Sequence, residues 1–523
     1  IGLQGSERAY FIARLYREMK KPIVVLLASA KEAEQFMADL RFFMPDATDR
    51  LHYLPPYNIL PFKFIAYHSE TAAHRIRTLY QVLNTSRPAI TVTTIGALMQ
   101  KVIPRQAIID FAELIMVGEE LDRDQLLAKL QAGGYSRAVI VEEPGDFSVR
   151  GGIIDIYTPL YRDALRIEFF GDWVDSLRFF SVDNQRTIDT IDEAIILPCR
   201  EAILTAEDIS PVVGRIREHA AHLEMPVTQV RKLVDRIKRE GTFPGVESLL
   251  PLIYPQLESF FDYMPRNALC VLADPGELEK AASEAQSRAV MNYEAARSEK
   301  RLCVAPDRLY LDWATIESKI DGLKPLAMKL LEVVGRRTDQ AEAPHSKHLR
   351  VADNRDIGAV LTGAQSRENL LAPLADWIKE HTAHGQTTLL VCRSKLQVER
   401  LQALLAPYRV PLRIGSDFRE VAAPARRRQG EVIICQGEIV QGFVWPDEAL
   451  AIITETEIFG ARQARRKRRR PPSPTALLDF DDLKQGELIV HDDHGIGRYE
   501  GLVKLQIEGA TSDFLLILYK DDD

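Results

Sequence analysis

The stretch Lys21–Ser29, KPIVVLLAS, decides the fold class of the chain, because it is an unbroken apolar run rich in β-branched residues. Such a run is typical of a strand that is buried on both faces of a parallel sheet. Arg8–Met19 before it and Lys31–Met44 after it carry apolar residues at helical spacing. Farther along, Arg87–Val102 reads as a strand that leads into a helix. Helices that alternate with buried strands predict an α/β domain with a parallel sheet.

The loop before the first helix has some features of a phosphate-binding loop and lacks others. Its candidate residues are Gly2, Gly5, Ser6, Glu7, Arg8 and Ala9. In a working loop the last glycine, a lysine and a Ser or Thr hydroxyl bind the phosphates and Mg²⁺. Here Glu7 adds a negative charge, Arg8 replaces the compact lysine, and Ala9 has no oxygen for the metal. Taken alone, the stretch also fits a glycine turn that only starts a helix.

A second apolar stretch, Ala268–Glu277, has the strand and the acidic residue of a Walker B motif. Asp274 ends its apolar run, and Pro275 stands where a catalytic glutamate would position water. The alternative is an ordinary strand that ends in an Asp-Pro-Gly turn. Two motifs that have both lost their catalytic residues indicate a degenerate nucleotide site, at which we expect no turnover.

Residues 112–199 change character. Ala164–Ile188 reads as strands joined by a Gly-Asp turn at 171–172 and an Asp-Asn turn at 183–184. Hairpin turns of this kind predict an antiparallel sheet, and therefore an α+β domain inserted into the first domain.

One face of this inserted sheet has an unusual composition. Arg166, Glu168 and Phe170 alternate along one strand, so they share a face, and the residues between them would face the core. A planar cation beside an exposed aromatic ring is typical of a protein interface. The alternative is that Phe170 is a core residue and that Arg166 pairs with Glu168 or Asp172.

Two further units follow. Residues 322–455 read as a separate α/β unit, with a buried strand at Thr387–Ser394. Between residues 462 and 470, seven of nine residues are basic, which is typical of a solvated linker and alternatively of a contact with phosphate or an acidic surface. From residue 476 onward, polar turns separate short strands, as in a small barrel.

The composition excludes several classes of protein. A chain of 523 residues with 46% hydrophobic and 27% charged residues is typical of a soluble protein of several domains. The net charge of −8 excludes a general attraction to nucleic acid. Five dispersed cysteines without a CxxC pair argue against disulfides and zinc, and His491–His494 would have to converge in a glycine turn, so we expect no metal. Without an apolar run of membrane length or a signal peptide, we expect a cytoplasmic protein with no membrane partner.

The inserted stretch resembles the domain shared by the excision-repair protein UvrB and the transcription-repair coupling factor family. The shared patterns lie over Arg150–Ile156 and Arg166–Asp172, and the closing form at Ser176–Thr187 is more similar to the coupling factors. Gly486–Leu502 resembles their RNA-polymerase-interacting domain, which is related to the CarD family. Leu54–Gln81 leaves little room for the long aromatic hairpin of UvrB, which again favours the coupling factors.

This resemblance implies a fold and a set of partners. The fold is a multidomain α/β protein with a degenerate RecA-like or UvrB-like domain, an inserted α+β domain, a second small α/β domain and a partial CarD/Tudor-like barrel. Arg150, Arg166 and Phe170 match the positions that contact UvrA, and Leu505 lies on the strand that contacts RNA polymerase, through its beta subunit. The alternative for Leu505 is a leucine in the core of the barrel. The family's motor, which uses ATP and Mg²⁺ to translocate on double-stranded DNA, matches no residue here, so we expect no cofactor in this fragment.

We therefore expect a recognition scaffold for transcription-coupled repair. The expected domains are a discontinuous α/β domain over 1–111 and 200–321, an insert over 112–199, an α/β domain over 322–455, a basic linker over 456–475 and a β domain over 476–523. The whole protein would displace stalled RNA polymerase and recruit UvrA for nucleotide excision repair. The alternatives are a damage-verifying DNA-binding protein of the UvrB kind and an active helicase-type NTPase.

Overall fold

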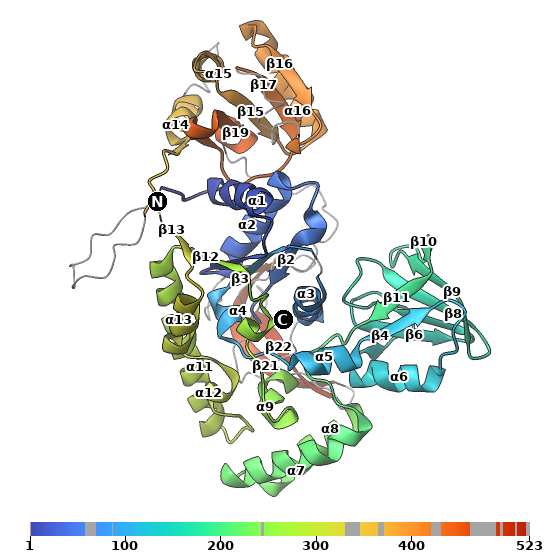
Figure 1. Ribbon diagram of the computed structural model, residues 1–523. Helices are drawn as coiled ribbons and strands as arrows, with labels where there is room; N and C mark the ends of the chain where they lie inside the picture. The colour runs from blue at the N-terminus through green and yellow to red at the C-terminus, as the bar shows by residue number, and fades with distance from the viewer. Residues whose placement is uncertain are drawn as a thin grey trace.

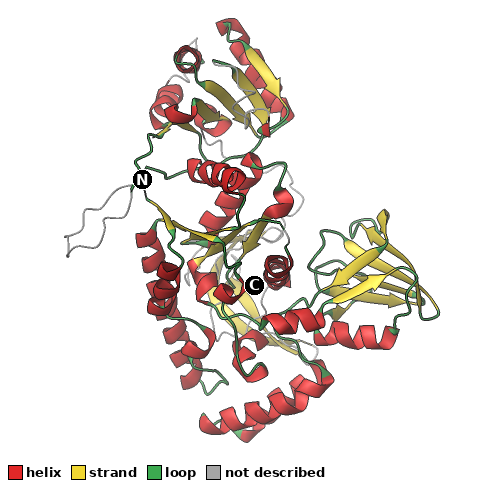
Figure 2. Cartoon of the chain, viewed as in Figure 1, coloured by secondary structure: helices red, strands yellow, loops and turns green. Residues whose placement is uncertain are grey.

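In the residues that it describes, the computed structural model has five β-sheets, and it confirms a mixed α/β protein of several parts (Figures 1 and 2). The structure describes residues 2–57, 69–85, 87–241, 245–329, 346–363, 371–419, 430–460, 488–491, 495–507 and 510–518. Three features of the sequence lie wholly or partly outside these residues. They are residues 58–68 of the stretch with little room for an aromatic hairpin, the basic run at 462–470, and residues 492–494. Within them, no helix is long and apolar enough to cross a membrane.

The first sheet is parallel throughout, as the sequence predicts, in the order β13-β12-β1-β3-β2. Its strands are β1 (Ile23–Leu27), β2 (Leu51–Leu54), β3 (Ile90–Thr94), β12 (Leu269–Ala273) and β13 (Leu326–Met328). The insert thus separates strands that lie in one sheet. The sheet also extends past residue 321, the expected end of this domain, because β13 pairs with β12.

Helices cover both faces of this sheet, which explains why its central strand is wholly apolar. Ile23, Val25 and Leu27 face one core, and Val24 and Leu26 face the other. The first core is covered by α1 (Glu7–Met19) and α2 (Ala30–Phe43). The second is covered by α3 (Ser69–Asn84), α4 (Ile95–Met99), α5 (Arg105–Phe111), α10 (Phe260–Tyr263), α11 (Pro275–Ser298) and α13 (Trp313–Gly322).

A smaller helical group packs around a third core. It comprises α7 (Ala206–His222), α8 (Val227–Glu240), α9 (Leu250–Ile253) and α12 (Pro306–Leu309). In Figure 1 the α7–α8 pair forms the end of the molecule opposite the residues coloured orange.

The insert is an antiparallel sheet on a short neck. The neck pairs β4 (Glu113–Met116) with β11 (Glu193–Ile196), so the chain enters and leaves the insert side by side. The main sheet has the order β10-β9-β8-β7-β6-β5 and is antiparallel except for β5–β6. Its strands are β5 (Ser136–Arg137), β6 (Asp146–Arg150), β7 (Ile153–Ile156), β8 (Ala164–Phe170), β9 (Trp173–Phe180) and β10 (Thr187–Ile191), and α6 (Arg123–Ala132) packs against them.

The next unit has a mixed sheet in the order β14-β18-β19-β15-β17-β16. Its strands are β14 (Ala352–Asp353), β15 (Thr387–Cys392), β16 (Leu412–Gly415), β17 (Val432–Gln436), β18 (Phe443–Trp445) and β19 (Leu450–Thr454). Its helices are α14 (Arg355–Gly363), α15 (Ala372–Ala383), α16 (Lys395–Leu405) and α18 (Glu455–Phe459). One face of the sheet has a core of its own with these helices.

The other face of this sheet shares one core with α1 and α2. Tyr10 on α1 lies between the sheets, with its ring centroid 5.8 Å from that of Phe443 and 5.7 Å from that of Trp445. Its hydroxyl donates to Glu448 at 2.9 Å, and Arg14 reaches the same carboxylate at 3.0 Å. Apolar spacing marks a helix face as buried but does not say which unit covers it.

The last sheet joins β20 (Leu488–His491), β21 (Gly495–Ile507) and β22 (Ala510–Leu518) in chain order, all antiparallel. Three short strands were expected here. Leu505 lies on β21 opposite Ser512, and its side chain lies outside what the structure describes.

Candidate functional site

One face of the insert carries a row of polar residues across four strands, and three of these residues are charged. Ser148, Asp155, Arg166 and Arg178 are register partners on β6, β7, β8 and β9. Side chains alternate along each strand, so their neighbours, such as Ile167, point into the core of the insert. The predicted alternation along β8 is confirmed.

Asp155 links the two arginines that were singled out in the sequence. Its side chain is 1% exposed, and its two oxygens accept hydrogen bonds from Arg166 Nε at 2.7 Å and Nη2 at 2.9 Å. The same carboxylate accepts a hydrogen bond from Arg150 Nη2 at 2.6 Å. The guanidinium of Arg166 also lies 4.6 Å from the ring centre of Phe180. Asp155 therefore fixes the direction of both guanidinium groups.

Phe170 is 81% exposed at the end of β8, beside the Gly171 turn. Its register partner Trp173 is 54% exposed, so two aromatic rings flank the turn. A large apolar side chain with this exposure gains free energy when a partner covers it. The insert thus exposes the ring of Phe170 at the end of β8, and the oriented guanidinium of Arg166, whose side chain is 18% exposed, lies four residues earlier on the same strand.

The structure contradicts the alternative interpretation of this strand. Phe170 is not a core residue, and Arg166 pairs with Asp155 rather than with Glu168 or Asp172. Glu168 instead pairs with Arg178 at 3.0 Å across β9. Sequence reasoning missed Asp155 and Trp173, although Asp155 stands inside the Arg150–Ile156 pattern.

The loop at the start of α1 is closed by a side chain of its own. Glu7 is 7% exposed, and its Oε1 accepts hydrogen bonds from the backbone N–H of Gln4 at 2.8 Å and of Gly5 at 2.9 Å. In a working phosphate loop such N–H groups point at the phosphates. The Glu7 carboxylate thus occupies donors that a phosphate would need. Arg8 forms an ion pair with Glu32 at 2.8 Å, and Ala9 is fully buried in the core.

The glycines of this loop serve contacts with the following units. Gly2 has a φ of +96°, and a Cβ there would lie 2.6 Å from the carbonyl oxygen of Leu349. A Cβ on Gly5 would lie 2.8 Å from Glu7 and 3.2 Å from Gln441. A larger residue at position 2 would clash with the backbone of Leu349, whereas at position 5 the nearest atoms are the ends of side chains, which can move.

Ser6 and Asp39 complete this contact. The backbone N–H of Gln441 donates to Ser6 Oγ at 3.0 Å, and that of Val440 donates to Asp39 Oδ1 at 2.9 Å. The loop that resembles a phosphate loop is therefore bound to the next unit.

Asp274 and Pro275 lie where β12 meets α11. Asp274 is the N-cap of α11 with a φ of 55°, and Pro275 is the first residue of the helix, where a missing N–H costs nothing. The stretch is therefore a strand-to-helix junction rather than the Asp-Pro-Gly turn of the alternative interpretation. Asp274 and Arg8 both line a cavity of about 1180 Å³ at the carboxyl ends of the parallel strands, the usual place for a ligand in this class of sheet.

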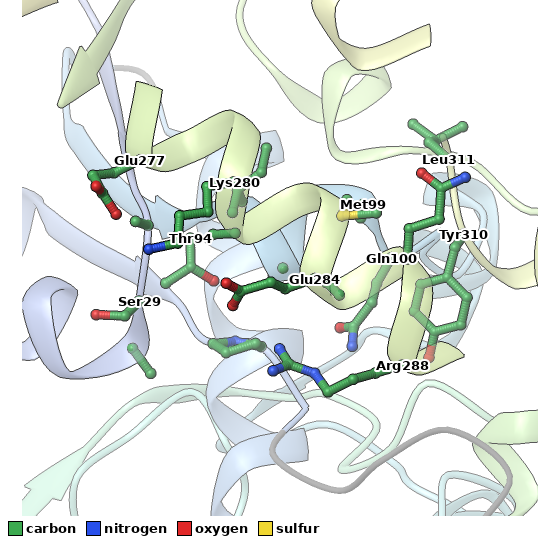
Figure 3. Close-up of a pocket in the computed structure, with 18 of the residues that line it drawn as sticks. Ser29, Thr94, Met99, Gln100, Glu277, Lys280, Glu284, Arg288, Tyr310 and Leu311 are labelled. Atoms are coloured by element: carbon green, nitrogen blue, oxygen red, sulfur yellow. The ribbon is translucent and has the colours of Figure 1, made fainter. Parts of the chain in front are cut away.

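The cavity itself is poorly suited to a nucleotide triphosphate. Figure 3 shows Glu277, Lys280, Glu284 and Arg288 on one face of α11, with Ser29 and Thr94 at the ends of β1 and β3. The charged residues that line it are the cations Arg8, Lys101, Lys280 and Arg288 and the acids Glu32, Asp274, Glu277, Glu284, Asp307 and Asp312. The acids outnumber the cations, so the field opposes a polyanion.

Replacing Glu7 with alanine is expected to destabilise the folded chain by about 2 kcal/mol, because two backbone N–H groups of the loop lose the charged acceptor that the buried Glu7 carboxylate provides. Urea unfolding checks this value. The control is Glu18→Ala on the same helix, whose side chain is 65% exposed and which should cost less than about 0.5 kcal/mol. Equal costs for the two variants would contradict the role given to Glu7.

The dependence of stability on pH tests the burial of Asp39. Burial raises the pKa of the Asp39 carboxyl to about 6, so this residue stabilises the fold as the pH falls from about 6 toward 4. Burial lowers the pKa of His52 to about 4, so the protonation of His52 destabilises the fold as the pH falls below 6.5. The two effects oppose each other.

Asp39→Asn removes the first effect. Between pH 7 and pH 5 this variant should lose about 1 to 2 kcal/mol of stability relative to the parent. Urea midpoints at the two pH values measure the difference. If the two proteins respond to pH alike, Asp39 does not titrate in this range.

Comparison with known families agrees with the layout of the structure. Residues 114–201 match the model of the UvrB interaction domain, and residues 381–458 match that of the MFD D3 domain. Residues 483–523 match the model of the CarD-like/TRCF RID domain.

The whole chain is also similar to curated proteins named transcription-repair-coupling factor. It is 29% identical over 531 residues to the one from Myxococcus xanthus, covering 100% of this chain and 44% of that protein. For Bacillus subtilis (strain 168) the identity is 28%, covering 100% and 43%, and for Escherichia coli (strain K12) it is 27%, covering 99% and 43%. The chain thus spans less than half the length of these relatives. The three domains and this similarity confirm the resemblance to the transcription-repair coupling factor family.

Proposed function

We propose that this chain, which carries the domains of the transcription-repair coupling factors, is a recognition scaffold for transcription-coupled DNA repair. Its task is to bind two proteins, UvrA and RNA polymerase, and to hold them near each other. The observation that carries the proposal is the outer face of the insert, where the buried Asp155 orients Arg150 and the partly buried Arg166 and where Phe170 is uncovered. This face lies within the residues that match the UvrB interaction domain.

UvrA would be bound through the aromatic and cationic groups together. Phe170 supplies apolar area that UvrA would cover, and such an anchor at the centre of an interface dominates its affinity. Arg166 presents a guanidinium whose Nε and Nη2 are already held by Asp155. Because the guanidinium is held before binding, little side-chain entropy is lost on association.

RNA polymerase would be bound through the last sheet, β20–β22, which overlaps the CarD-like/TRCF RID match. Addition of a polymerase strand to an edge of this sheet, on the beta subunit, is the expected mode. Leu505 on β21 remains the candidate contact residue. We also propose that this domain folds as a small β-barrel.

The first domain would be a RecA-like, UvrB-like scaffold that has lost its nucleotide chemistry. Glu7 occupies the loop donors, and an acidic cavity opposes triphosphate. ATP, Mg²⁺ and the translocation of double-stranded DNA would belong to the motor of the whole protein.

Capture of the chain by immobilised UvrA tests this function. The parent should be retained, and the Arg166→Ala/Phe170→Ala double variant should pass through. Failure to retain the parent would refute the proposal, and equal retention of both would refute the surface. An ATPase assay addresses the rival NTPase, since turnover that Arg8→Ala abolishes would favour it. Tight binding to lesion-bearing DNA would favour the UvrB-like rival.

A further inference from the structure

Helix α8, Val227–Glu240, has a strongly basic outer face on an acidic chain. Between residues 231 and 239 there are five cations and one carboxylate, whereas the whole chain has a net charge of −8. The cations are Arg231, Lys232, Arg236, Lys238 and Arg239, and all five are exposed. A local concentration of this kind is an electrostatic feature in its own right.

The opposite face of α8 fixes the helix on the protein. Val234 and Ile237 are 2% and 1% exposed, and Val230 and Leu233 pack against the same core. All four fall on one side at helical spacing, so the cations must point outward. The basic face is therefore held in place by a packed core.

Three of the five cations are not neutralised by an ion pair in the described part of the chain. Within the described residues, Arg231, Lys232 and Lys238 take part in no ion pair. In Figure 1, α8 lies at the end of the molecule with α7, away from the sheets of the insert. This position leaves room for a large, extended partner.

We propose that the outer face of α8 binds the phosphate backbone of double-stranded DNA. Arg231 and Lys238 lie one above the other, seven residues apart, and so do Lys232 and Arg239. At about 1.5 Å rise per residue, each pair spans roughly 10 Å along the helix. Duplex DNA carries one negative charge per about 1.7 Å of its axis, so several phosphates lie within reach of this face.

The composition of the face favours phosphate over an acidic protein. A protein interface needs a buried aromatic or aliphatic anchor at its centre. Here the outward residues between 231 and 239 are all charged, and the exposed Val227 lies at the start of the helix. Cations without an apolar anchor are sufficient to bind a nucleic-acid backbone without sequence preference. This surface is separate from the insert face, so it does not rest on the function proposed above.

Fluorescence anisotropy with a short labelled DNA duplex tests the proposal on the full chain. The test variant is Arg231→Glu/Lys232→Glu/Lys238→Glu. The control is Lys379→Glu/Lys395→Glu/Arg400→Glu, which makes the same charge change on the exposed surfaces of α15 and α16. The test variant should lose affinity at least roughly 10-fold, and the slope of log K against log salt should fall by about 2 to 3. The control should retain most of the affinity.

Two results would overturn the proposal. One is an equal loss of DNA affinity in the two triple variants, and the other is no binding of the duplex by the parent. A third variant, with the basic residues of 462–470 changed to serine, removes the other basic stretch of the chain. The difference in DNA affinity between the α8 triple variant and the control triple variant must remain when both also carry these serine substitutions. Binding of poly-glutamate without binding of DNA would also overturn the proposal, and would assign the face to an acidic protein.

Discussion

Replacing Phe170 with alanine is expected to weaken the binding of UvrA by roughly 30-fold or more, which corresponds to at least about 2 kcal/mol. The physical reason is the exposure of the ring, of which 81% is uncovered in the free chain and available for burial. Isothermal titration of UvrA with the parent and the variant measures the change. Because an exposed ring adds little to the fold, the unfolding midpoint should not move.

Ile188 provides the matched control for this experiment. It is 54% exposed on β10, in the same sheet, but it lies away from the Phe170 turn. Ile188→Ala should bind UvrA like the parent. If the two variants bind equally well, Phe170 is not an anchor, and the insert must use another surface.

Replacing Arg75 with alanine is expected to destabilise the first domain by about 3 to 5 kcal/mol. Arg75 and Glu201 are both 0% exposed and form an ion pair at 2.6 Å. Glu201 also accepts a hydrogen bond from the Tyr57 hydroxyl at 3.0 Å, and the guanidinium lies 4.3 Å from the Tyr57 ring centre. Removing the cation leaves a buried carboxylate without its counter-charge.

This network also fixes the point at which the insert rejoins the first domain, because Glu201 follows the neck strand β11. Urea unfolding measures the predicted loss. Arg105→Ala is the control, since its pair with Glu258 is half exposed and should cost about 1 kcal/mol or less. A loss for Arg75→Ala no larger than that of the control would contradict the role given to this network.

Much of the fold could be predicted from local sequence. The apolar run at Lys21–Ser29 and the hairpin turns of Ala164–Ile188 each depend on neighbours in the chain, and both were read correctly. The core that α1 shares with the β15–β19 sheet was not predicted, because it depends on contacts between residues hundreds of positions apart. Tyr10 and Glu448 are an example, since nothing near either residue in the sequence points to the other.

The candidate site could be predicted only in part, again because some of its contacts join residues from different strands. Alternation placed Arg166 and Phe170 on one outer face without any knowledge of the neighbouring strands. The partner of Arg166 depends on the register between β7 and β8, and the pairing with Asp155 is visible only in the structure. From the sequence, Glu7 was interpreted only as a negative charge in place of a glycine. The structure shows that its carboxylate accepts hydrogen bonds from the loop N–H groups.

Hydrogen–deuterium exchange of the chain, with and without UvrA, tests the central claim most directly, because it locates the contact without any substitution. The account predicts slower exchange in peptides from Asp146–Phe180, which contain the Arg166 and Phe170 face, and no change around Gly2–Ala9. Slower exchange only outside the insert, or no change at saturating UvrA, would contradict the claim that this chain recruits UvrA through the insert.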